Sequence, residues 1–388
     1  MNRAIKYRIY PNSEQEVFFA KTFGCCRKVW NLMLAAREEA VQSDSKQAIP
    51  TPASFKADYP YLKEVDSLAL ANVQLNLNKA YSACRTIKGR HKPRFKSKRR
   101  SRASYTTNNQ NGTVAVDAKA GTIRLPKAGF VKAELHRMPE DDWTLKSATV
   151  SKDPDGRYYC SVLYEYDREM PVVNAPQNNA IGLDYKSDGL YVDSNGATGG
   201  SPKHYRKAAA KLAKAQQALS RKQGAHKGEA QSKNYTKQRR KLARIHKHIA
   251  NQRKDFLHKK SAEIANQYDM VCVEDLNMTD VAHAHSYRNY RKATYDNGYG
   301  MFLSMLEYKL VDRGKVFIKL DEHYPSTQTC SCCGSVSGPV GDAVRRWICP
   351  DCGAKHNRDL NAAINIKKEG IRLYMANNPL TYGRAGTA

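Results

Sequence analysis

Two short cysteine pairs near the C-terminal end constrain the fold of this chain more tightly than any other feature. The segments CSCCG at 330–334 and CPDCG at 349–353 both read C-x-x-C-G, with fifteen residues between the pairs. Two residues between thiolates let one tight turn present both sulfurs to a tetrahedral ion, and the glycine lets the backbone curl beneath them. The spacing predicts a zinc ribbon with one Zn²⁺ ion bound by Cys330, Cys333, Cys349 and Cys352. Four thiolates leave no open coordination position, so the ion is expected to be structural, and Cys332 is interpreted as a bystander.

The charge balance indicates a polyanionic partner. The 388 residues include 65 Lys and Arg against 37 Asp and Glu, a net charge of +28. Nucleic acid is the commonest partner of so basic a chain. A membrane surface is the rival, but we find no amphipathic helix with a greasy face, no apolar run of about eighteen residues and no signal peptide in MNRAIKYRIYPNSEQ. We therefore expect a cytoplasmic, nucleoid-associated protein of a prokaryotic cell that does not bind membranes.

Two segments concentrate the positive charge. Residues 85–102 hold ten Lys and Arg and no acid, and residues 203–260 hold 19 Lys and Arg against two acids, a local balance of +17. In the second segment, apolar side chains recur at spacings of three and four, which predicts two antiparallel helices that share an apolar seam. The seam residues are Ala208, Leu212, Ala215, Leu219, Leu242, Ile245, Ile249 and Phe256. A solvated face normally mixes charge signs, so phosphate contact is the favoured interpretation of both segments.

The first half of the chain alternates between predicted strands and helices. Ile5, Tyr7 and Ile9 lie on one face of an N-terminal strand, and Ser13 with Glu16 predicts a capping box at the start of a helix. A second helix is predicted over 67–85, with Leu68, Leu75 and Tyr81 as its apolar positions. Short β-branched and aromatic runs fill 113–166 between Gly, Pro and Asp. Together they predict a small β-barrel around a helical insertion.

Three acidic residues stand at the ends of apolar segments in the second half. Asp184 is expected to end a first strand, Glu274-Asp275 ends a later strand, and Asp359 opens a helix after the cysteine pairs. Adjacent strand residues face opposite ways, so only one of Glu274 and Asp275 can join Asp184. Each acid alone is weak evidence, and Asp359 also suits an ordinary helix start. In this order, however, the acids fit two Mg²⁺ ions that hydrolyse a phosphodiester.

These segments resemble one family. GLDYKSDGLYVDSNG, VCVEDLNM, YPSTQTCSCCG and CPDCGAKHNRDLNAAINI are similar to the RuvC segments and zinc ribbon of TnpB, and YRIYPNSEQ and PRFKSKRR resemble it too. The resemblance implies an α/β plus β-barrel fold, with an RNase H-like RuvC nuclease domain and a wedge-type β-barrel that carries a helical recognition insertion. It also implies an RNA-guided DNA endonuclease with Asp184, Glu274 and Asp359 as catalytic Mg²⁺ ligands. Lys186 departs from the family, since many relatives have Gly there.

The resemblance also divides the chain. It implies a wedge-type barrel at 1–10 and 104–170, a recognition lobe at 11–103, a RuvC-like domain at 178–329, a zinc ribbon at 330–352, a last RuvC segment at 353–373 and a loose tail at 374–388. The expected partners are a guide RNA encoded near a transposon end and double-stranded target DNA beside a short motif. Candidate nucleic-acid contacts are Gln74, Asn76, Asn108, Arg94, Lys96, Arg239, Arg240 and Lys241.

Two other functions remain open from the sequence. One is a non-cleaving RNA-guided DNA-binding regulator on the same fold, and the other is a transposition accessory protein that binds DNA without RNA. Trp347 with Arg345 and Arg346 could contact nucleic acid or could serve packing and solvated charge. The guide sequence, the adjacent motif, the order of cutting and the oligomeric state are not encoded in any pattern that we recognise.

Overall fold

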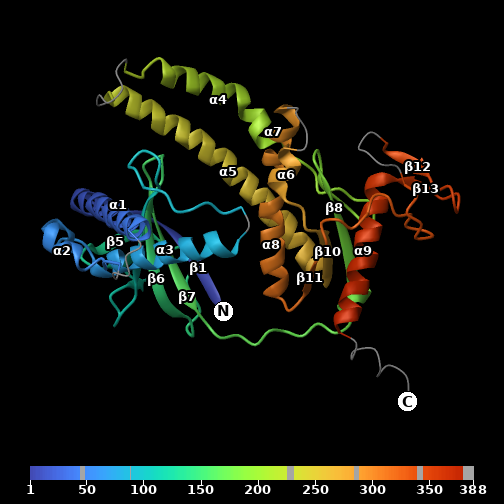
Figure 1. Ribbon diagram of the computed structural model, residues 1–388, viewed down its shortest axis with the longest axis horizontal. Coiled ribbons are helices and arrows are strands. Elements are labelled where there is room, and N and C mark those ends of the chain that lie inside the picture. Colours follow the sequence, from blue (N-terminus) through green and yellow to red (C-terminus); the bar gives the residue numbers. More distant parts are fainter. Residues whose placement is uncertain (44–48, 88, 225–230, 284–287, 339–343, 379–388) are drawn as a thin grey trace. The chain divides into compact units, whose positions relative to one another are not determined.

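The computed structural model describes residues 1–43, 49–87, 89–224, 231–283, 288–338 and 344–378. They form two compact units, Met1–Arg168 and Glu169–Ala388 (Figure 1), which are described separately. None of the described helices combines the length and the apolar content needed to cross a bilayer.

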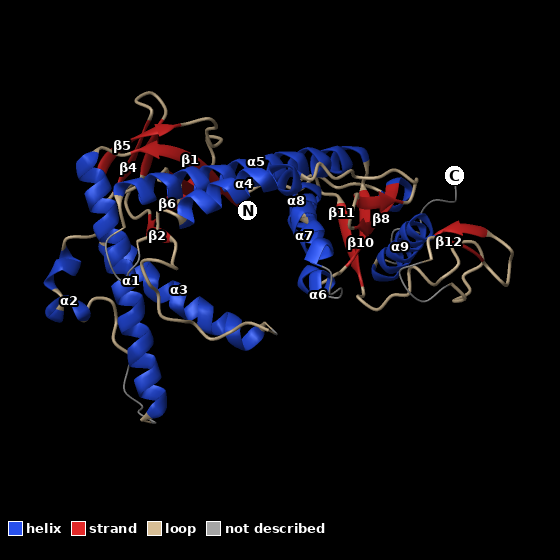
Figure 2. Ribbon diagram, turned by 90° about the horizontal axis from the view of Figure 1, so that it is seen from above, coloured by secondary structure: helices blue, strands red, loops and turns tan. Residues whose placement is uncertain are grey.

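A seven-stranded antiparallel sheet dominates the first unit (Figure 2). Its elements are β1 (Asn2–Tyr10), α1 (Ser13–Gln42), α2 (Phe55–Asp58), η1 (Pro60–Lys63), α3 (Ser67–Thr86), β2 (Ala103–Asn108), β3 (Ala115–Asp117), β4 (Thr122–Leu125), β5 (Gly129–Glu134), β6 (Thr144–Lys152) and β7 (Tyr158–Glu165). The strand order is β2-β6-β7-β1-β5-β4-β3. Strands β2 and β3 are the two ends of this order, and the sheet is a curled half-barrel, a coarser form of the small barrel that the sequence predicts.

Strand β1 lies at the centre of this sheet because its alternation gives one predominantly apolar face. Ile5, Tyr7 and Ile9 are at most 5% exposed, as predicted, whereas Tyr10 on the opposite face is 42% exposed. The buried face packs with Phe19 of α1 in one hydrophobic core. The Tyr7 hydroxyl, the one polar group among these three side chains, donates to the Arg137 carbonyl at 2.7 Å.

Two local predictions in this unit are wrong by small shifts. The capping box of α1 uses Asn12 and Gln15 in place of Ser13 and Glu16, because Asn12 Oδ1 accepts from the Gln15 backbone at 2.8 Å and Gln15 Oε1 accepts from the Asn12 backbone at 3.1 Å. In α3, the predicted apolar position Leu75 is 49% exposed. The buried stripe comprises Ala69, Leu70, Val73 and Leu77. The face of α3 that is buried is therefore determined by its packing against α1 and β2, and not by hydropathy alone.

The second unit is built on a mixed four-stranded sheet. Its elements are η2 (Pro176–Asn179), β8 (Ala180–Lys186), β9 (Leu190–Asp193), α4 (His204–Ser220), α5 (Lys233–Gln267), β10 (Met270–Glu274), α6 (Met278–His283), α7 (Arg288–Asn297), α8 (Tyr299–Val311), β11 (Val316–Leu320), β12 (Arg346–Ile348), β13 (Lys355–Asn357) and α9 (Arg358–Asn377). The order is β11-β10-β8-β9. Strands β8, β10 and β11 are parallel, and β9 returns antiparallel to β8.

Strand alternation gives this sheet two different apolar faces. Ile181, Leu183, Val271 and Val273 pack with residues of α5 and α8, including Leu257 and Phe302. The residues between them, Ala180, Met270 and Cys272, pack with Ile366 of α9. Helix α9 lies very close to the sheet, because a Cβ added at Gly182 would collide with the Ala363 backbone, and one at Gly370 with the Cys272 side chain. Two glycines therefore set the distance between α9 and the strands.

Helices α4 and α5 form the predicted basic hairpin. Leu212, Ala215 and Leu219 of α4 share one cluster with Leu242 and Ile249 of α5, which confirms the apolar seam. Phe256 is the exception, since it packs against the core under α8. Asp296, at the end of α7, accepts hydrogen bonds from the Tyr205 and Arg206 backbones and so caps α4.

Candidate active site and metal centre

The alternation of the second sheet brings the three predicted acids to one side. Asp184 has the same parity along β8 as Ala180 and Gly182, and Glu274 has the same parity along β10 as Met270 and Cys272, so both side chains face α9. Asp359 stands in the first turn of α9 itself. The sequence prediction that Asp184 ends its strand is wrong, because β8 continues to Lys186 through pairing with β9.

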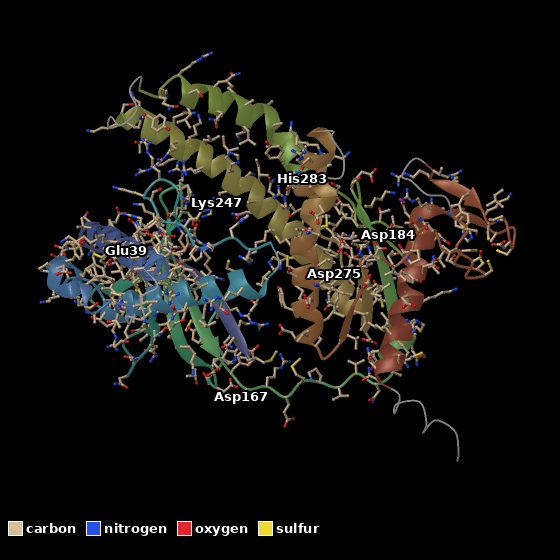
Figure 3. All side chains as sticks on the ribbon, in the orientation of Figure 1. Glu39, Asp167, Asp184, Lys247, Asp275 and His283 are labelled. Atoms are coloured by element: carbon tan, nitrogen blue, oxygen red, sulfur yellow. The ribbon has the colours of Figure 1, made fainter. Side chains whose placement is uncertain are left out.

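The neighbouring acid Asp275 is excluded from this side. It is exposed, and its carboxylate lies 3.8 Å from Lys319 Nζ. Asp184 and Asp275, both labelled in Figure 3, therefore differ in burial as well as in direction. This outcome follows from the strand rule that only one of Glu274 and Asp275 can face α9.

The three acids interact electrostatically. Burial raises the pKa of Asp184 well above its ordinary value, and the charges of Glu274 and Asp359 raise it further, while Arg358 and Lys186 act in the opposite direction. Burial also raises the pKa of Glu274, and a hydrogen bond from the Ser326 hydroxyl opposes that effect. Three negative charges are thus unfavourable here without a cation.

The three carboxylates do not converge as tightly as the ligands of a single ion would. In the described chain, the oxygens of the three carboxylates do not all approach within 4.8 Å of one another. Two ions roughly 3.5–4 Å apart, each about 2.1 Å from its ligands, can accept carboxylates that are roughly 8 Å apart. The donors are all hard oxygens, the ligand type that Mg²⁺ prefers.

Buried amides connect the segment after β11 to α9. Asn361 Nδ2 donates to the Thr329 carbonyl at 2.8 Å, and Asn365 Nδ2 donates to the carbonyls of Ser326 and Thr329 at 2.8 and 2.6 Å. Both amides are at most 3% exposed. Because the Ser326 hydroxyl donates to Glu274, these contacts fix Glu274 relative to the helix that carries Asp359. No sequence pattern pointed to Ser326 or Asn365.

The four predicted zinc ligands converge. The sulfurs of Cys330, Cys333, Cys349 and Cys352 all lie within 4.8 Å of one another. The Cys330–Cys352 and Cys333–Cys349 sulfur distances are 3.6 and 3.7 Å. A tetrahedral ion with metal–sulfur bonds of about 2.3 Å requires sulfurs about 3.8 Å apart. The cluster therefore fits a tetrahedral metal ion.

Both cysteine turns have the same construction. Gly334 N donates to the Cys330 carbonyl and Gly353 N donates to the Cys349 carbonyl, each at 2.9 Å. The two glycines have φ values of +82° and +70°, in the left-handed region that side-chain-bearing residues rarely adopt. The predicted role of glycine in the C-x-x-C-G turn is confirmed.

His356 is a further partner of the cysteine cluster that the sequence did not reveal. Its Nε2 lies 3.1 Å from Cys330 Sγ, and its ring packs against Trp347 with centroids 4.6 Å apart. Trp347 is only 8% exposed, so it serves packing. Cys332 is exposed and lies close to Cys330 and His356, which form a second possible ligand group with it. The four-cysteine group alone supplies a complete tetrahedral set.

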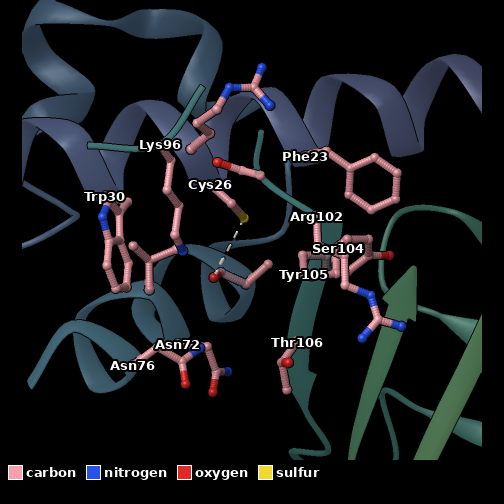
Figure 4. A pocket seen from close by; sticks show the side chains of 14 residues that line it. Phe23, Cys26, Trp30, Asn72, Asn76, Lys96, Arg102, Ser104, Tyr105 and Thr106 are labelled. Atoms are coloured by element: carbon pink, nitrogen blue, oxygen red, sulfur yellow. Dashed lines mark hydrogen bonds between the residues drawn. The ribbon is translucent and has the colours of Figure 1, made fainter. Parts of the chain in front are cut away.

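The predicted nucleic-acid contacts of the first unit are scattered. Asn76 and Lys96 line the same pocket of about 100 Å³ with Trp30, Asn72 and Tyr105 (Figure 4). Lys96 Nζ lies 3.4 Å from the centre of the Trp30 ring. Three further candidates do not line it: Gln74, Arg94 and Asn108. The pocket is therefore a polar hollow between α1, α3 and β2 that uses only two of the five candidates.

The candidates on the basic hairpin are solvent-facing. Arg239, Arg240 and Lys241 are all exposed on α5. Arg240 also lines an open groove with Lys233, Lys237 and Arg244. This placement leaves their charges free to meet a polyanion.

Three family models match parts of the chain. Residues 161–284 match the OrfB family of IS605 described as "Probable transposase", residues 299–366 match a "Cas12f1-like, TNB domain" and residues 1–46 match a "Helix-turn-helix domain". Over the described part of that last range the structure has β1 and one 30-residue helix. The chain in the "Cryo-EM structure of the Cas12f1-sgRNA-target DNA complex" aligns with a TM-score of 0.53 at 12% identity, covering 95% of this chain and 98% of that one, which shows a shared fold.

Two named relatives span nearly the whole sequence. A "Putative RNA-guided DNA endonuclease" of Streptomyces pristinaespiralis is 35% identical over 386 residues, covering 96% of this chain and 90% of the relative. "Putative RNA-guided DNA endonuclease InsQ" of Escherichia coli (strain K12) is 28% identical, covering 98% and 96%. Similarity of this extent assigns the chain to the TnpB family.

Proposed function

We propose that this protein is an RNA-guided DNA endonuclease that hydrolyses target DNA at the carboxylate cluster. The observation that carries the proposal is the position of Asp184, Glu274 and Asp359 on the α9 side of the four-stranded sheet. The names of the two relatives support the same activity.

The topology of the second unit supports an RNase H-like RuvC core. Three parallel strands with β9 antiparallel at one edge, and α9 across one face, suit such a core. Within the proposal, the first unit supplies the wedge-type barrel and the recognition lobe, with the domain boundaries predicted from the sequence.

The chain's own groups divide the chemistry. Asp184, Glu274 and Asp359 would hold two Mg²⁺ ions, which when bound supply an activated water and stabilise the leaving oxygen. Ser326 and Asn365 keep Glu274 in place against α9. The four cysteines would hold one Zn²⁺ ion that fixes the hairpin β12–β13, and this hairpin leads directly into the first turn of α9.

Recognition would rest on charge and on base pairing. Exposed cations such as Arg94, Arg239, Arg240 and Lys241 would contact phosphates, and the amides of Gln74, Asn76 and Asn108 would read a short DNA motif. Pairing with a guide RNA would supply the remaining sequence specificity.

The test is to purify the protein with its bound RNA, sequence that RNA and incubate the complex with a plasmid library that carries the matching target. We expect Mg²⁺-dependent cleavage beside a short shared motif, and no cleavage by the Asp184→Ala protein. Guided binding without cleavage by the natural protein would support a non-cleaving regulator. Binding that survives RNase treatment would support an accessory protein that acts without RNA.

A further inference from the structure

Both oxygens of the Asp359 carboxylate are already paired with cations of the chain. Lys186 Nζ lies 3.1 Å from Oδ2, and Arg345 Nη1 lies 3.1 Å from Oδ1. The Asp359 side chain is 14% exposed and that of Lys186 is 30% exposed, whereas that of Arg345 is 65% exposed. Lys186 is therefore the more enclosed of the two partners.

The position of Lys186 follows from strand geometry. It stands two residues after Asp184 on β8, so both side chains point to the α9 face. Pairing with Leu190 on β9 holds its backbone, and its carbonyl accepts from Asn297 Nδ2 at 3.2 Å. Asn297 is 5% exposed and is itself bound by the Ser201 hydroxyl at 2.8 Å.

The turn between β8 and β9 restricts the positions that the aliphatic stem of Lys186 can adopt. A Cβ added at Gly189 would lie 3.1 Å from Lys186 Cδ, so the tight turn between β8 and β9 passes directly beside the lysine stem. The ammonium group is therefore presented to Asp359 by a supported side chain and not by a freely moving one.

An ammonium group and a divalent ion compete for the same carboxylate oxygen. A hydrogen bond from Nζ uses a lone pair of Oδ2 that an ion would need, and the positive charge repels any cation bound between Asp184 and Asp359. The ammonium charge also offsets part of the negative charge that Asp359 shares with Asp184 and Glu274, so a built-in cation stabilises the ion-free site.

We propose that Lys186 is a displaceable internal cation that occupies an ion-binding oxygen of Asp359 and thereby sets the divalent-ion concentration at which the nuclease site fills. The proposal rests on the proposed function, since it requires Asp359 to be an ion ligand. It assigns Lys186 as a positioning residue that acts through Asp359. Arg345 plays a smaller part, because its exposed guanidinium can exchange Asp359 for water readily.

The test measures ion binding directly. The full-length protein with its RNA is titrated with Mn²⁺, and free Mn²⁺ is followed by electron paramagnetic resonance. A neighbouring cation changes the proton affinity of a carboxylate by roughly tenfold or more, and we take the same scale for the affinity of Asp359 for a divalent ion. We therefore expect Lys186→Met, which keeps the apolar stem, to lower the Mn²⁺ concentration at half-saturation (the midpoint) by about tenfold. The midpoint of Lys186→Arg should stay close to that of the natural protein. Lys186→Gln is a second neutral variant in case the methionine variant does not fold.

Lys21→Met is the matched control. Lys21 forms a similar ion pair with Glu64 at 2.7 Å, is 57% exposed and lies in the first unit, so its loss changes the net charge equally. We expect its midpoint to equal that of the natural protein. An unchanged or higher midpoint for both neutral Lys186 variants overturns the proposal. If, in that case, the natural protein binds Mn²⁺ and cuts DNA, the proposed function is supported and only the role of Lys186 is rejected. If neither the natural protein nor any variant binds Mn²⁺ beyond the level of Asp184→Ala, both proposals fall.

Discussion

The cysteine cluster and the carboxylate cluster of the second unit are both candidate metal sites, but they are built in opposite ways. The cysteines come from two turns of the same construction, and each turn is closed by its own backbone hydrogen bond. The carboxylates come from β8, β10 and α9, with Asp184 and Asp359 separated by most of the unit. The first site depends on local chain geometry, whereas the second depends on how closely a helix packs on a sheet. The carboxylate cluster can therefore be disrupted without loss of the cysteine cluster.

The largest expected effect is loss of the metal ion from the cysteine cluster. Cys349→Ser should abolish binding of one Zn²⁺ ion per chain and unfold the ribbon, because such an ion contributes on the order of 10–16 kcal/mol in isolated zinc-finger peptides. Metal analysis and hydrogen exchange over 330–357 measure this. Cys332→Ser is the control and should keep the ion. Loss of the ion in both variants would contradict the assignment of Cys332 as a bystander.

The next effect concerns catalysis at the carboxylates. Replacing Asp184, Glu274 or Asp359 by Ala should slow DNA cleavage by roughly a thousandfold or more, which corresponds to about 4 kcal/mol in the barrier. Binding of the guide RNA and the zinc content should not change. Asp275→Ala is the matched control, since that acid is exposed and faces away from α9. Comparable loss of cleavage in Asp275→Ala would show that the wrong acid of the pair was assigned.

A substitution that disturbs the packing of α9 on the sheet should affect the carboxylate cluster but not the cysteine cluster. Gly182→Ala should destabilise the second unit by about 1–3 kcal/mol, because the new methyl group meets the backbone of α9, which cannot move aside as a side chain can. Cleavage should fall while zinc content is retained. Gly24→Ala in α1, where the nearest atom to the added Cβ is 4.0 Å away, should be neutral or stabilising. Chemical denaturation of both variants measures the difference.

The ion-free carboxylate cluster should oppose folding in a pH-dependent manner. The pKa of Asp184 is raised in the folded state, so the folded protein binds this proton more tightly than the unfolded chain does. Stability is then lost as the pH rises from the unfolded pKa, about 3.9, through the folded pKa. Without Mg²⁺, Asp184→Asn should be more stable at neutral pH by about 1.4 kcal/mol for each unit by which the pKa is raised.

Thermal melting at several pH values tests this expectation. The advantage of Asp184→Asn should shrink toward pH 4, where the natural side chain is protonated in both states. Excess Mg²⁺ should reverse it, because the natural protein gains ligand-binding stability that the variant lacks. A stability difference that does not vary with pH would contradict this account.

The smallest effect concerns the basic hairpin. Changing Arg239, Arg240 and Lys241 together to Ala should flatten the salt dependence of nucleic-acid binding, by about 0.9 in log–log slope for each lost contact with a duplex phosphate. Neither metal site should respond. Lys21→Ala is an exposed-lysine control in the first unit. Equal slopes for the natural and the triple-variant protein would mean that these side chains are only solvated.

The sequence predicted the elements of the second unit better than the details of the first. Apolar spacing in the basic segment was sufficient to place the seam of α4 and α5, because helical periodicity reports directly which side chains share a face. The same reasoning misplaced the apolar face of α3, where Leu75 is exposed. It also predicted a small barrel where the structure has a half-barrel sheet, since strand patterns do not encode closure.

The residues that surround the carboxylates were not accessible to sequence reasoning. Lys186 and Arg345 are ordinary basic residues in a chain with 65 of them, and only the coordinates place both beside Asp359. Ser326, Asn365 and His356 carry no motif of their own. Their roles arise from contacts between segments that are distant along the chain, and residue spacing contains no information about such contacts.

By itself, the sequence determined which four cysteines converge, the strand parity of Glu274 and Asp275 and the basic surface of the hairpin. These depend on short-range geometry, which repeats at fixed intervals of two, three or four residues. Only the tertiary structure decided how near α9 comes to the sheet, which cations meet Asp359 and which hydroxyl holds Glu274. Those distances depend on Gly182 and Gly370, whose missing side chains matter only once a helix lies against them.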